Sequence, residues 1–342
     1  MNTSVNKQRD SNMELYRILA MLTVLFFHAS GEIDLLGNQI FPDQITTTSI
    51  INLWLVSATF VCVDMFVLLS GWYGINTKIQ KIKAFIFQIL FYSVILYATI
   101  IAVQPEVHFS LNFLIHLFIM DDYWFVPVYL MLYLIAPALN PFIRNTSFRQ
   151  FTTLLIAAIT MQSVFGWLNP RESGYMEGCS PISFIILYLI GAYLHRFSDR
   201  LFIKRKSLLM GTYFMLITFN WILALLAKNI QNEYLLGLSW KFSSPIVIAA
   251  AACLLLTFSK LNIGYNKTVN WIAASSFAAF LIHCFPYFYN YVYRPMIIFL
   301  FTEYSLWFSI PFIILFVLLL YLASILIDKI RIKIYQLSSS VL

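Results

Sequence analysis

Ten apolar segments, each about long enough to cross a lipid bilayer, follow one another through this chain of 342 residues. A membrane-spanning helix needs roughly 20 mainly apolar residues. The short alternating runs that are typical of a membrane β-barrel are absent from the sequence. The sequence therefore predicts an all-α integral membrane protein with about ten transmembrane helices in one bundle, over residues 13–30, 50–72, 84–103, 124–143, 150–168, 181–197, 208–227, 243–259, 270–291 and 305–327.

The composition excludes several other classes of protein. Hydrophobic residues make up 61% of the chain and charged residues only 11%, whereas a soluble domain has about half and about a quarter. This excludes a soluble globular enzyme, a disordered chain and a disulfide scaffold. The four cysteines show no metal-binding spacing, and we interpret them as packing thiols. The expected organisation is an N-terminal tail over residues 1–11, a transmembrane domain over 12–327 and a C-terminal tail over 328–342.

Lysine and arginine alternate between the connecting segments. Arg17 lies within the first apolar segment, and all but four of the other lysines and arginines, which total 22 with Arg17, fall on one side of the predicted membrane. The positive-inside rule makes that side the cytoplasm and places both termini there. If the first segment were instead a cleaved signal peptide, nine spans would remain and the alternation would be lost. The net charge of +7 is explained by orientation, so we expect no nucleic-acid partner. The four exceptions are Arg171, Lys228, Lys241 and Arg294.

The first apolar segment carries two ionisable residues on one face. Arg17 and His28 are eleven positions apart, which is about 20° beyond three full helical turns and about 16 Å along the axis. Ionisable groups within a membrane span usually face the bundle interior or a wet cavity. The pair therefore predicts a path with a cationic inner mouth and a base near the outer mouth. The alternative is that Arg17 extends to lipid headgroups and His28 only caps the outer helix end.

Two later segments carry further polar residues at membrane depth. Asp64 lies within the second segment, where Arg17 or His28 would keep its carboxylate charged, and His283 lies in the ninth at a depth similar to that of His28. Two histidines at one level would bracket a reacting hydroxyl. The alternatives are that Asp64 ties helices together by hydrogen bonds and that His283 is a satisfied core residue.

Charged residues flank the predicted spans on both sides. On the cytoplasmic side, Lys78 and Lys81 would bind the phosphates of a cytoplasmic donor molecule together with Arg17. The alternative is that they only set the orientation of the chain in the membrane. On the outer side, Asp121, Asp122 and Trp124 precede the fourth segment. Carboxylates accept hydrogen bonds from sugar hydroxyls and an indole face covers sugar C–H groups, so these residues would suit a glycan. An ordinary aromatic belt with outer-loop acids is the alternative.

The motifs Arg17-x10-His28, Asp64-Met-Phe-x3-Ser70-Gly71 and Phe280-Leu-Ile-His283 resemble those of the membrane acyltransferase-3 family. The segment from Tyr123 to Pro141 looks like that of bacterial capsule and exopolysaccharide O-acetyltransferases. Lys78-x-x-Lys81 stands where many members have Arg-x-x-Arg, and Tyr16 stands where many have Asp.

The resemblance implies an enzyme of the bacterial plasma membrane that transfers acyl groups other than amino-acyl groups. The donor would be cytoplasmic acetyl-CoA or another acyl-CoA, and the acceptor a hydroxyl of a cell-surface polysaccharide or of its lipid-linked precursor. Arg17, Lys78 and Lys81 would bind the donor. His28 would act as general base or carry the acyl group transiently, and Asp64 or His283 would orient it.

We expect no tightly bound cofactor and no metal, because two well-separated histidines and one aspartate make a poor zinc site. The oligomeric state is left open.

Two functions of other classes compete with this one. A transporter or flippase of a lipid-linked glycan or small metabolite would also have many spans with polar residues inside them. The lack of an internal repeat or a nucleotide site counts against it. A polysaccharide polymerase should carry a large outer loop with several arginines, and the outer segments here are short and mainly acidic.

Overall fold

The computed structural model describes residues 10–34, 46–104, 106–108, 110–112, 123–168, 174–200 and 205–339, with side chains to residue 337. Throughout these ranges the regular structure is helical, without a β-strand. The principal helices are α1 (Ser11–Asp34), α2 (Thr47–Thr59), α3 (Cys62–Tyr73), α4 (Ile79–Val103), α6 (Phe125–Asn145), α7 (Phe148–Leu168), α8 (Pro181–Arg196), α9 (Lys206–Asn229), α10 (Glu233–Ser239), α11 (Pro245–Ser259), α12 (Lys267–Ala273), α13 (Ser276–His283), α14 (Pro286–Phe288), α15 (Arg294–Thr302) and α16 (Leu306–Ser339).

Several helices begin where local chemistry favours it. The Ser180 and Ser244 hydroxyls accept hydrogen bonds from backbone N–H groups in the first turns of α8 and α11. Each serine is followed by a proline, Pro181 or Pro245, whose missing N–H is not needed at the first helical position. The Asn266 side chain likewise accepts a hydrogen bond from a backbone N–H group in the first turn of α12. These caps set the ends of the shorter helices that surround the centre of the bundle.

The all-α membrane class is confirmed, but the number of spans is not. Among the described residues, six helices are long and apolar enough to cross a membrane, or seven if one bent pair counts as a span. Helices α8 and α11 are shorter apolar helices of 16 and 15 residues. Ten spans therefore remain a prediction, while a multi-pass membrane protein is established.

Two predicted spans are interrupted, and one of them is sharply bent. The second, 50–72, consists of α2 and α3 with an interruption at Phe60 and Val61. The ninth, 270–291, ends in a bend of 72° between Lys267–His283 and Pro286–Thr302. Pro286 lacks the N–H that would continue α13, and its ring obstructs the preceding turn. Both breaks lie beside the candidate site described below.

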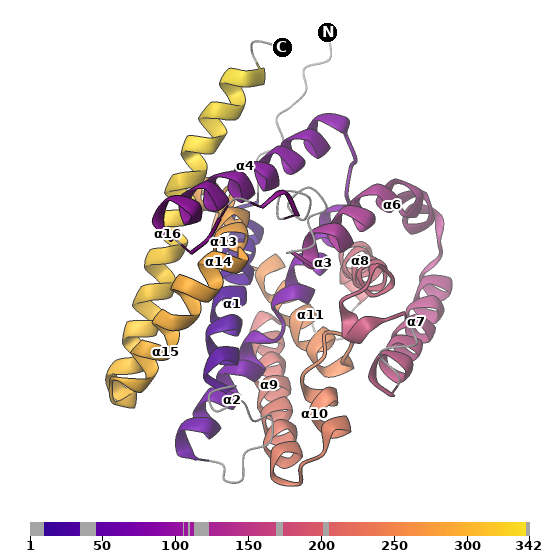
Figure 1. Ribbon diagram of the computed structural model, residues 1–342. Helices are drawn as coiled ribbons and strands as arrows, with labels where there is room; N and C mark the ends of the chain where they lie inside the picture. The colour runs from indigo at the N-terminus through magenta and orange to yellow at the C-terminus, as the bar shows by residue number, and fades with distance from the viewer. Residues whose placement is uncertain are drawn as a thin grey trace.

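Helix α1 lies at the centre of the bundle and packs against α2, α3, α11, α12, α13, α15 and α16 (Figure 1). Its first residue and the end of α16 lie at the same end of the molecule (Figure 1). Helix α4 runs obliquely to α1 near that end and packs against α13 and α16. The C-terminal segment from residue 328 continues α16, and Asp328 and Arg331 within it are buried.

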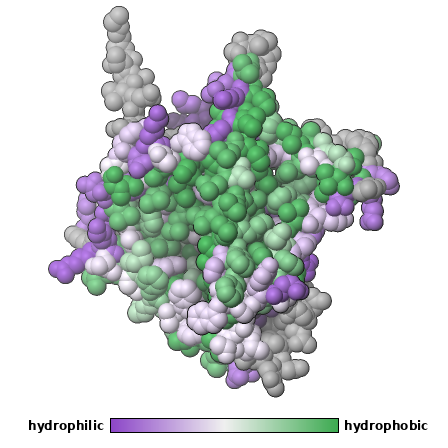
Figure 2. Space-filling view, turned by 90° about the vertical axis from the view of Figure 1, so that its left-hand side faces the viewer, coloured by the Kyte–Doolittle hydropathy of each residue, from purple (hydrophilic) through white to green (hydrophobic). Residues whose placement is uncertain are grey.

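The surface over α16 and its neighbours is a broad apolar face with hydrophilic residues gathered toward its edges (Figure 2). Large side chains of α16 stand out from the protein there, including Trp307, Leu319 and Leu326, which are 87%, 56% and 61% exposed. Soluble monomers rarely expose so large a continuous apolar patch. Contact with lipid tails explains it, because the bilayer accepts side chains that water would not.

Helices α3 and α8 approach each other closely through two glycines. A Cβ at Gly71 would overlap the carbonyl oxygen of Tyr188, and a Cβ at Gly191 would overlap that of Leu68. Small residues permit such close approach between membrane helices. This contact fixes α3, which lines each of the cavities described below.

Candidate active site

Arg17 and His28 line two cavities inside the bundle. The cavity at His28, called the His28 cavity here, measures about 330 Å³ and is mainly apolar. The cavity at Arg17, the Arg17 cavity, measures about 470 Å³ and is more polar. The two adjoin, because Phe66, Phe125 and Phe277 line both. One face of α1 therefore presents Arg17 and His28 to two adjoining cavities, in keeping with the eleven-residue spacing.

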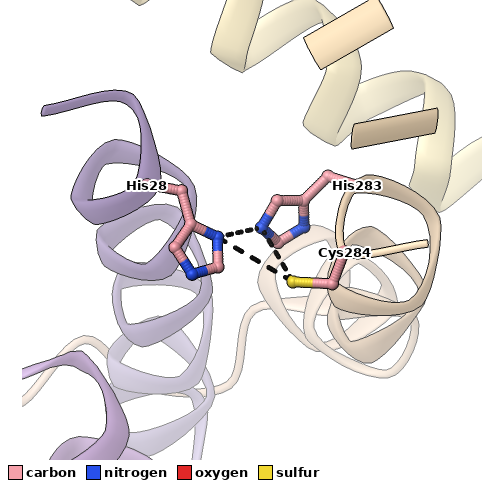
Figure 3. Close-up of side chains that lie close together, drawn as sticks. All are labelled: His28, His283 and Cys284. Atoms are coloured by element: carbon pink, nitrogen blue, oxygen red, sulfur yellow. Dashed lines mark hydrogen bonds between the residues drawn. The ribbon is translucent and has the colours of Figure 1, made fainter. Parts of the chain in front are cut away.

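His28 and His283 form a hydrogen-bonded pair (Figure 3). His28 Nδ1 lies 2.8 Å from His283 Nε2, and His283 Nδ1 lies 2.7 Å from the carbonyl oxygen of Ala279. Because a carbonyl only accepts, the neutral His283 ring carries its hydrogen on Nδ1 and accepts at Nε2. His28 Nδ1 then donates, and His28 Nε2, which is directed away from His283 in Figure 3, keeps a free lone pair.

Cys284 completes a cluster with the two histidines (Figure 3). Its Sγ lies 3.4 Å from His283 Nε2 and 3.8 Å from His28 Nδ1. One atom from each of the three residues could serve as a metal ligand, and these atoms lie within 4.8 Å of one another. The premise that the histidines are well separated is thus wrong, because α1 and α13 bring them together. Two nitrogens on one tetrahedral zinc lie about 3.3 Å apart, whereas 2.8 Å is a direct hydrogen bond. A site without metal stays a prediction.

Aromatic side chains and thiols surround the His28 cavity. Trp124 lines it and stacks on Phe242, with ring centroids 6.2 Å apart. Cys62 and Cys179 also line it, so three of the four cysteines face one cavity with His28. Burial raises the pKa of the Cys179 thiol to about 12. Interpreting the cysteines only as packing residues overlooked this common location.

The Arg17 cavity combines charge with hydroxyl groups. The Arg17 guanidinium donates to Glu14 Oε2 at 2.5 Å and keeps about a third of its side chain exposed. Lys81 lines the same cavity, and the hydroxyls of Ser70 and Tyr129 share a hydrogen bond of 3.0 Å at its wall. Lys78, at the start of α4, is exposed and does not line either cavity. The structure therefore groups Arg17 with Lys81 but not with Lys78.

Asp64 is completely buried in α3 and does not line either cavity. Neither of its carboxylate oxygens has a hydrogen-bond partner among the described residues. Of the two residues proposed to orient His28, it is His283 that contacts it. Asp121 and Asp122 lie outside the described residues, so only Trp124 of the proposed acceptor group has a described position.

A second polar cluster at the C-terminal end of α1 was missed. The Tyr289 hydroxyl donates to Glu32 Oε1 at 2.6 Å, and Arg294 Nε lies 2.9 Å from Glu32 Oε2. The Tyr289 ring lines the His28 cavity and meets the His28 ring edge to face, with centroids 5.9 Å apart. The available signal was that Glu32 follows His28 by four residues, on the same helical face.

This arrangement suits an acyl transfer to a hydroxyl. Activation of a hydroxyl by a base needs a free lone pair on the base and a third group that orients it. His28 Nε2 supplies the lone pair, and His283 holds His28 by the other ring nitrogen. The cationic Arg17 cavity next to this site would accommodate an anionic donor.

No curated protein and no solved structure is significantly similar to the chain. A family model described as an acyltransferase domain matches residues 10–329, which is nearly the whole chain. That range contains both cavities and the histidine pair. The protein therefore belongs to the membrane acyltransferase-3 family and is a multi-pass membrane acyltransferase that transfers groups other than amino-acyl groups.

Proposed function

We propose that the protein transfers an acetyl group from cytoplasmic acetyl-CoA to a hydroxyl of a cell-surface polysaccharide or its lipid-linked precursor. It would do so in the plasma membrane of a bacterium. The observation that carries this proposal is the pair of adjoining cavities, one cationic at Arg17 and one apolar at the His28–His283 pair. With one cavity at each end of this stretch of α1, a donor and an acceptor would meet from opposite faces of the membrane.

The chemical step follows from the lone pair on His28 Nε2. The acceptor hydroxyl gives its proton to Nε2 as its oxygen forms a bond to the thioester carbonyl carbon. The carbon–sulfur bond then breaks, and the departing thiolate takes the proton from His28. His283 accepts a hydrogen bond from His28 Nδ1 throughout and so stabilises the transient positive charge on the His28 ring.

The donor's anionic groups would meet the cationic cavity. Arg17 and Lys81 line it and would attract phosphate oxygens, while the exposed Lys78 would add long-range attraction. Trp124 lines the His28 cavity and would cover one face of an acceptor sugar. Asp121 and Asp122 remain proposed acceptor residues from the sequence.

The first prediction concerns His28 and Arg17 directly. We expect His28→Ala to lower acetyl transfer by about a hundredfold or more, because it removes the base. We expect Arg17→Ala to raise the KM for acetyl-CoA, and Arg17→Lys to restore only part of the affinity because lysine lacks the guanidinium fork. The measurement uses cells supplied with isotope-labelled acetate, in which mass spectrometry follows acetyl groups on envelope polysaccharide. Membrane vesicles with labelled acetyl-CoA give the KM.

His108→Ala is the matched control, because this imidazole is exposed and does not line either cavity. It should retain full transfer. Unchanged acetylation in a His28→Ala protein that is still present in the membrane would contradict the proposed function. If His28→Ala and His108→Ala both lost transfer, the assay would be reporting protein expression rather than catalysis.

A further inference from the structure

A third cavity opens beside the Arg17 cavity, where α3, α6 and α8 end. It measures about 590 Å³, and we call it the Trp72 cavity. It shares Tyr73, Gly74, Ile75 and Asn76 with the Arg17 cavity. Its remaining lining residues are Gly71, Trp72, Asn140, Ile143, Arg144, Ala192, His195 and Arg196.

The shared wall is a short loop held firmly in place. The Ile75 N–H donates to the Tyr188 hydroxyl at 2.9 Å, and the Ile75 carbonyl accepts from Asn140 Nδ2 at 2.9 Å. The Tyr188 hydroxyl in turn donates to Asn140 Oδ1 at 2.7 Å. Gly74, with φ of +73°, makes the turn that ends α3. One hydrogen-bonded loop therefore borders both cavities, which lie side by side along it.

Helix α3 contributes to all three cavities in sequence order. Cys62 lines the His28 cavity, Ser70 the Arg17 cavity and Trp72 the Trp72 cavity. Trp72 follows Cys62 by ten positions, which is about 15 Å along a helix. The three cavities thus form a row that begins at the histidine pair and ends at the face of the molecule where α3, α6 and α8 end.

The Trp72 cavity has the chemistry of a nucleotide site. The Trp72 and His195 rings pack with centroids 4.8 Å apart, so aromatic surface lies in its wall. Two arginines, Arg144 and Arg196, line the same cavity. Arg196 is held by hydrogen bonds to the carbonyls of Ile143 and Thr146, whereas Arg144 is exposed at the end of α6. Aromatic rings stack on bases, and guanidinium groups bind phosphate through paired hydrogen bonds.

We propose that the Trp72 cavity binds the 3′-phosphorylated adenosine end of coenzyme A, with Arg144 on the 3′-phosphate and the adenine packed against Trp72. This inference rests on the proposed function, since it assumes a coenzyme A donor. The pantetheine arm then passes through the Arg17 cavity, where Arg17 and Lys81 meet the pyrophosphate. The thioester reaches the His28 cavity past Phe66, Phe125 and Phe277.

The test compares coenzyme A with 3′-dephospho-coenzyme A, using purified protein in lipid nanodiscs and isothermal titration calorimetry. Wild-type protein should bind coenzyme A more tightly than the dephosphorylated form. Arg144→Ala should weaken coenzyme A binding by about ten- to a hundredfold and leave binding of the dephosphorylated form nearly unchanged. Trp72→Ala should weaken both ligands, and Trp72→Phe should restore part of the loss.

Arg149→Ala is the matched control, because it removes an exposed arginine nearby that does not line the three cavities. It should leave the affinity for both ligands unchanged. An Arg144→Ala effect of equal size on both ligands, or no effect on either, would overturn the assignment of the 3′-phosphate. Repeating the titrations in nanodiscs with anionic lipid shows whether a lipid headgroup holds Arg144 instead: a loss of the Arg144-dependent preference there would also overturn it.

Failure of this inference and failure of the proposed function give different results. If wild-type protein binds acetyl-CoA and transfers acetyl groups while Arg144→Ala shows no ligand preference, only the nucleotide position is wrong. If wild-type protein binds neither coenzyme A form, the proposed donor itself is wrong.

Discussion

His28 depends on His283 for its tautomer. The carbonyl of Ala279 fixes the hydrogen of His283 on Nδ1, and this leaves Nε2 to accept from His28. Without that acceptor, His28 could carry its hydrogen on either ring nitrogen, and the productive form would be diluted. His283 is therefore a positioning residue, in the sense that it acts on the acceptor hydroxyl only through His28.

We accordingly expect His283→Ala to lower kcat by about ten- to a hundredfold, less than His28→Ala does, with the KM for acetyl-CoA almost unchanged. His283 lies outside the Arg17 cavity, so donor binding should not depend on it. His283→Gln keeps an acceptor oxygen and should restore part of the rate. Initial rates in membrane vesicles separate kcat from KM, and a defect confined to KM would contradict the positioning role.

Gly71 allows a test of the helix contact that supports the cavities. We expect Gly71→Ala to destabilise the protein by about 1–3 kcal/mol, because the added methyl group would overlap the Tyr188 carbonyl oxygen. The control is Gly211→Ala in α9, where a Cβ meets nothing within 4 Å and alanine should stabilise the helix slightly. Thermal unfolding in detergent measures both, and a Gly71→Ala protein as stable as wild type would disprove the close contact.

The limits of sequence reasoning differ between residues. The common face of Arg17 and His28 was predictable, because both lie on one helix whose periodicity is known. The contact between His28 and His283 joins positions 255 residues apart, so only the packing of α1 on α13 reveals it. Asp64 shows a different limit. A carboxylate at membrane depth suggested a charged partner, yet neither of its oxygens has a hydrogen-bond partner among the described residues, and Asp64 lines neither cavity. Cys284 carries no spacing signal at all.

At the scale of elements, the broken ninth segment shapes the site. After Pro286 ends the preceding helix, a π-helical turn, Tyr289–Tyr293, leads into α15. Tyr289 packs on His28 and Tyr293 on His283, with ring centroids 5.9 and 5.4 Å apart. Such turns occur frequently at functional sites. A straight helix through 270–291, as the apolar pattern suggested, would not carry both tyrosines to the histidines.

The π-helical turn leads to a prediction for Tyr289. Tyr289→Phe keeps the ring beside His28 but loses the hydrogen bond to Glu32. We expect the transfer rate to fall about two- to tenfold, and Glu32→Gln to have a similar effect. Tyr291→Phe is the control, because Tyr291 lies in the same turn, is 48% exposed and does not line the His28 cavity. Equal rates for Tyr289→Phe and Tyr291→Phe would show that the Glu32 contact has no role in positioning.

At the scale of the whole molecule, the order of the cavities distinguishes the two ends of the helix bundle. The Trp72 and Arg17 cavities lie near the ends of α3, α6 and α8, and the His28 cavity lies farther along α1 toward Asp34. At that far end, Lys228 of α9 pairs with Asp34 at 2.9 Å. An anionic donor from the cytoplasm would therefore need the Arg17 end of α1 to face inward, as the distribution of lysine and arginine predicts.

This orientation is testable by labelling single added cysteines in intact cells with a membrane-impermeant maleimide. Glu233→Cys lies in α10, beside the far end of α9, and should react from outside. Lys333→Cys lies in the last turns of α16, at the opposite end (Figure 1), and should react only after permeabilisation. Wild-type protein, with its native cysteines, gives the background. The reverse pattern would place His28 on the cytoplasmic side, where it would meet the donor before any envelope glycan. The order of cavities would then contradict transfer across the membrane.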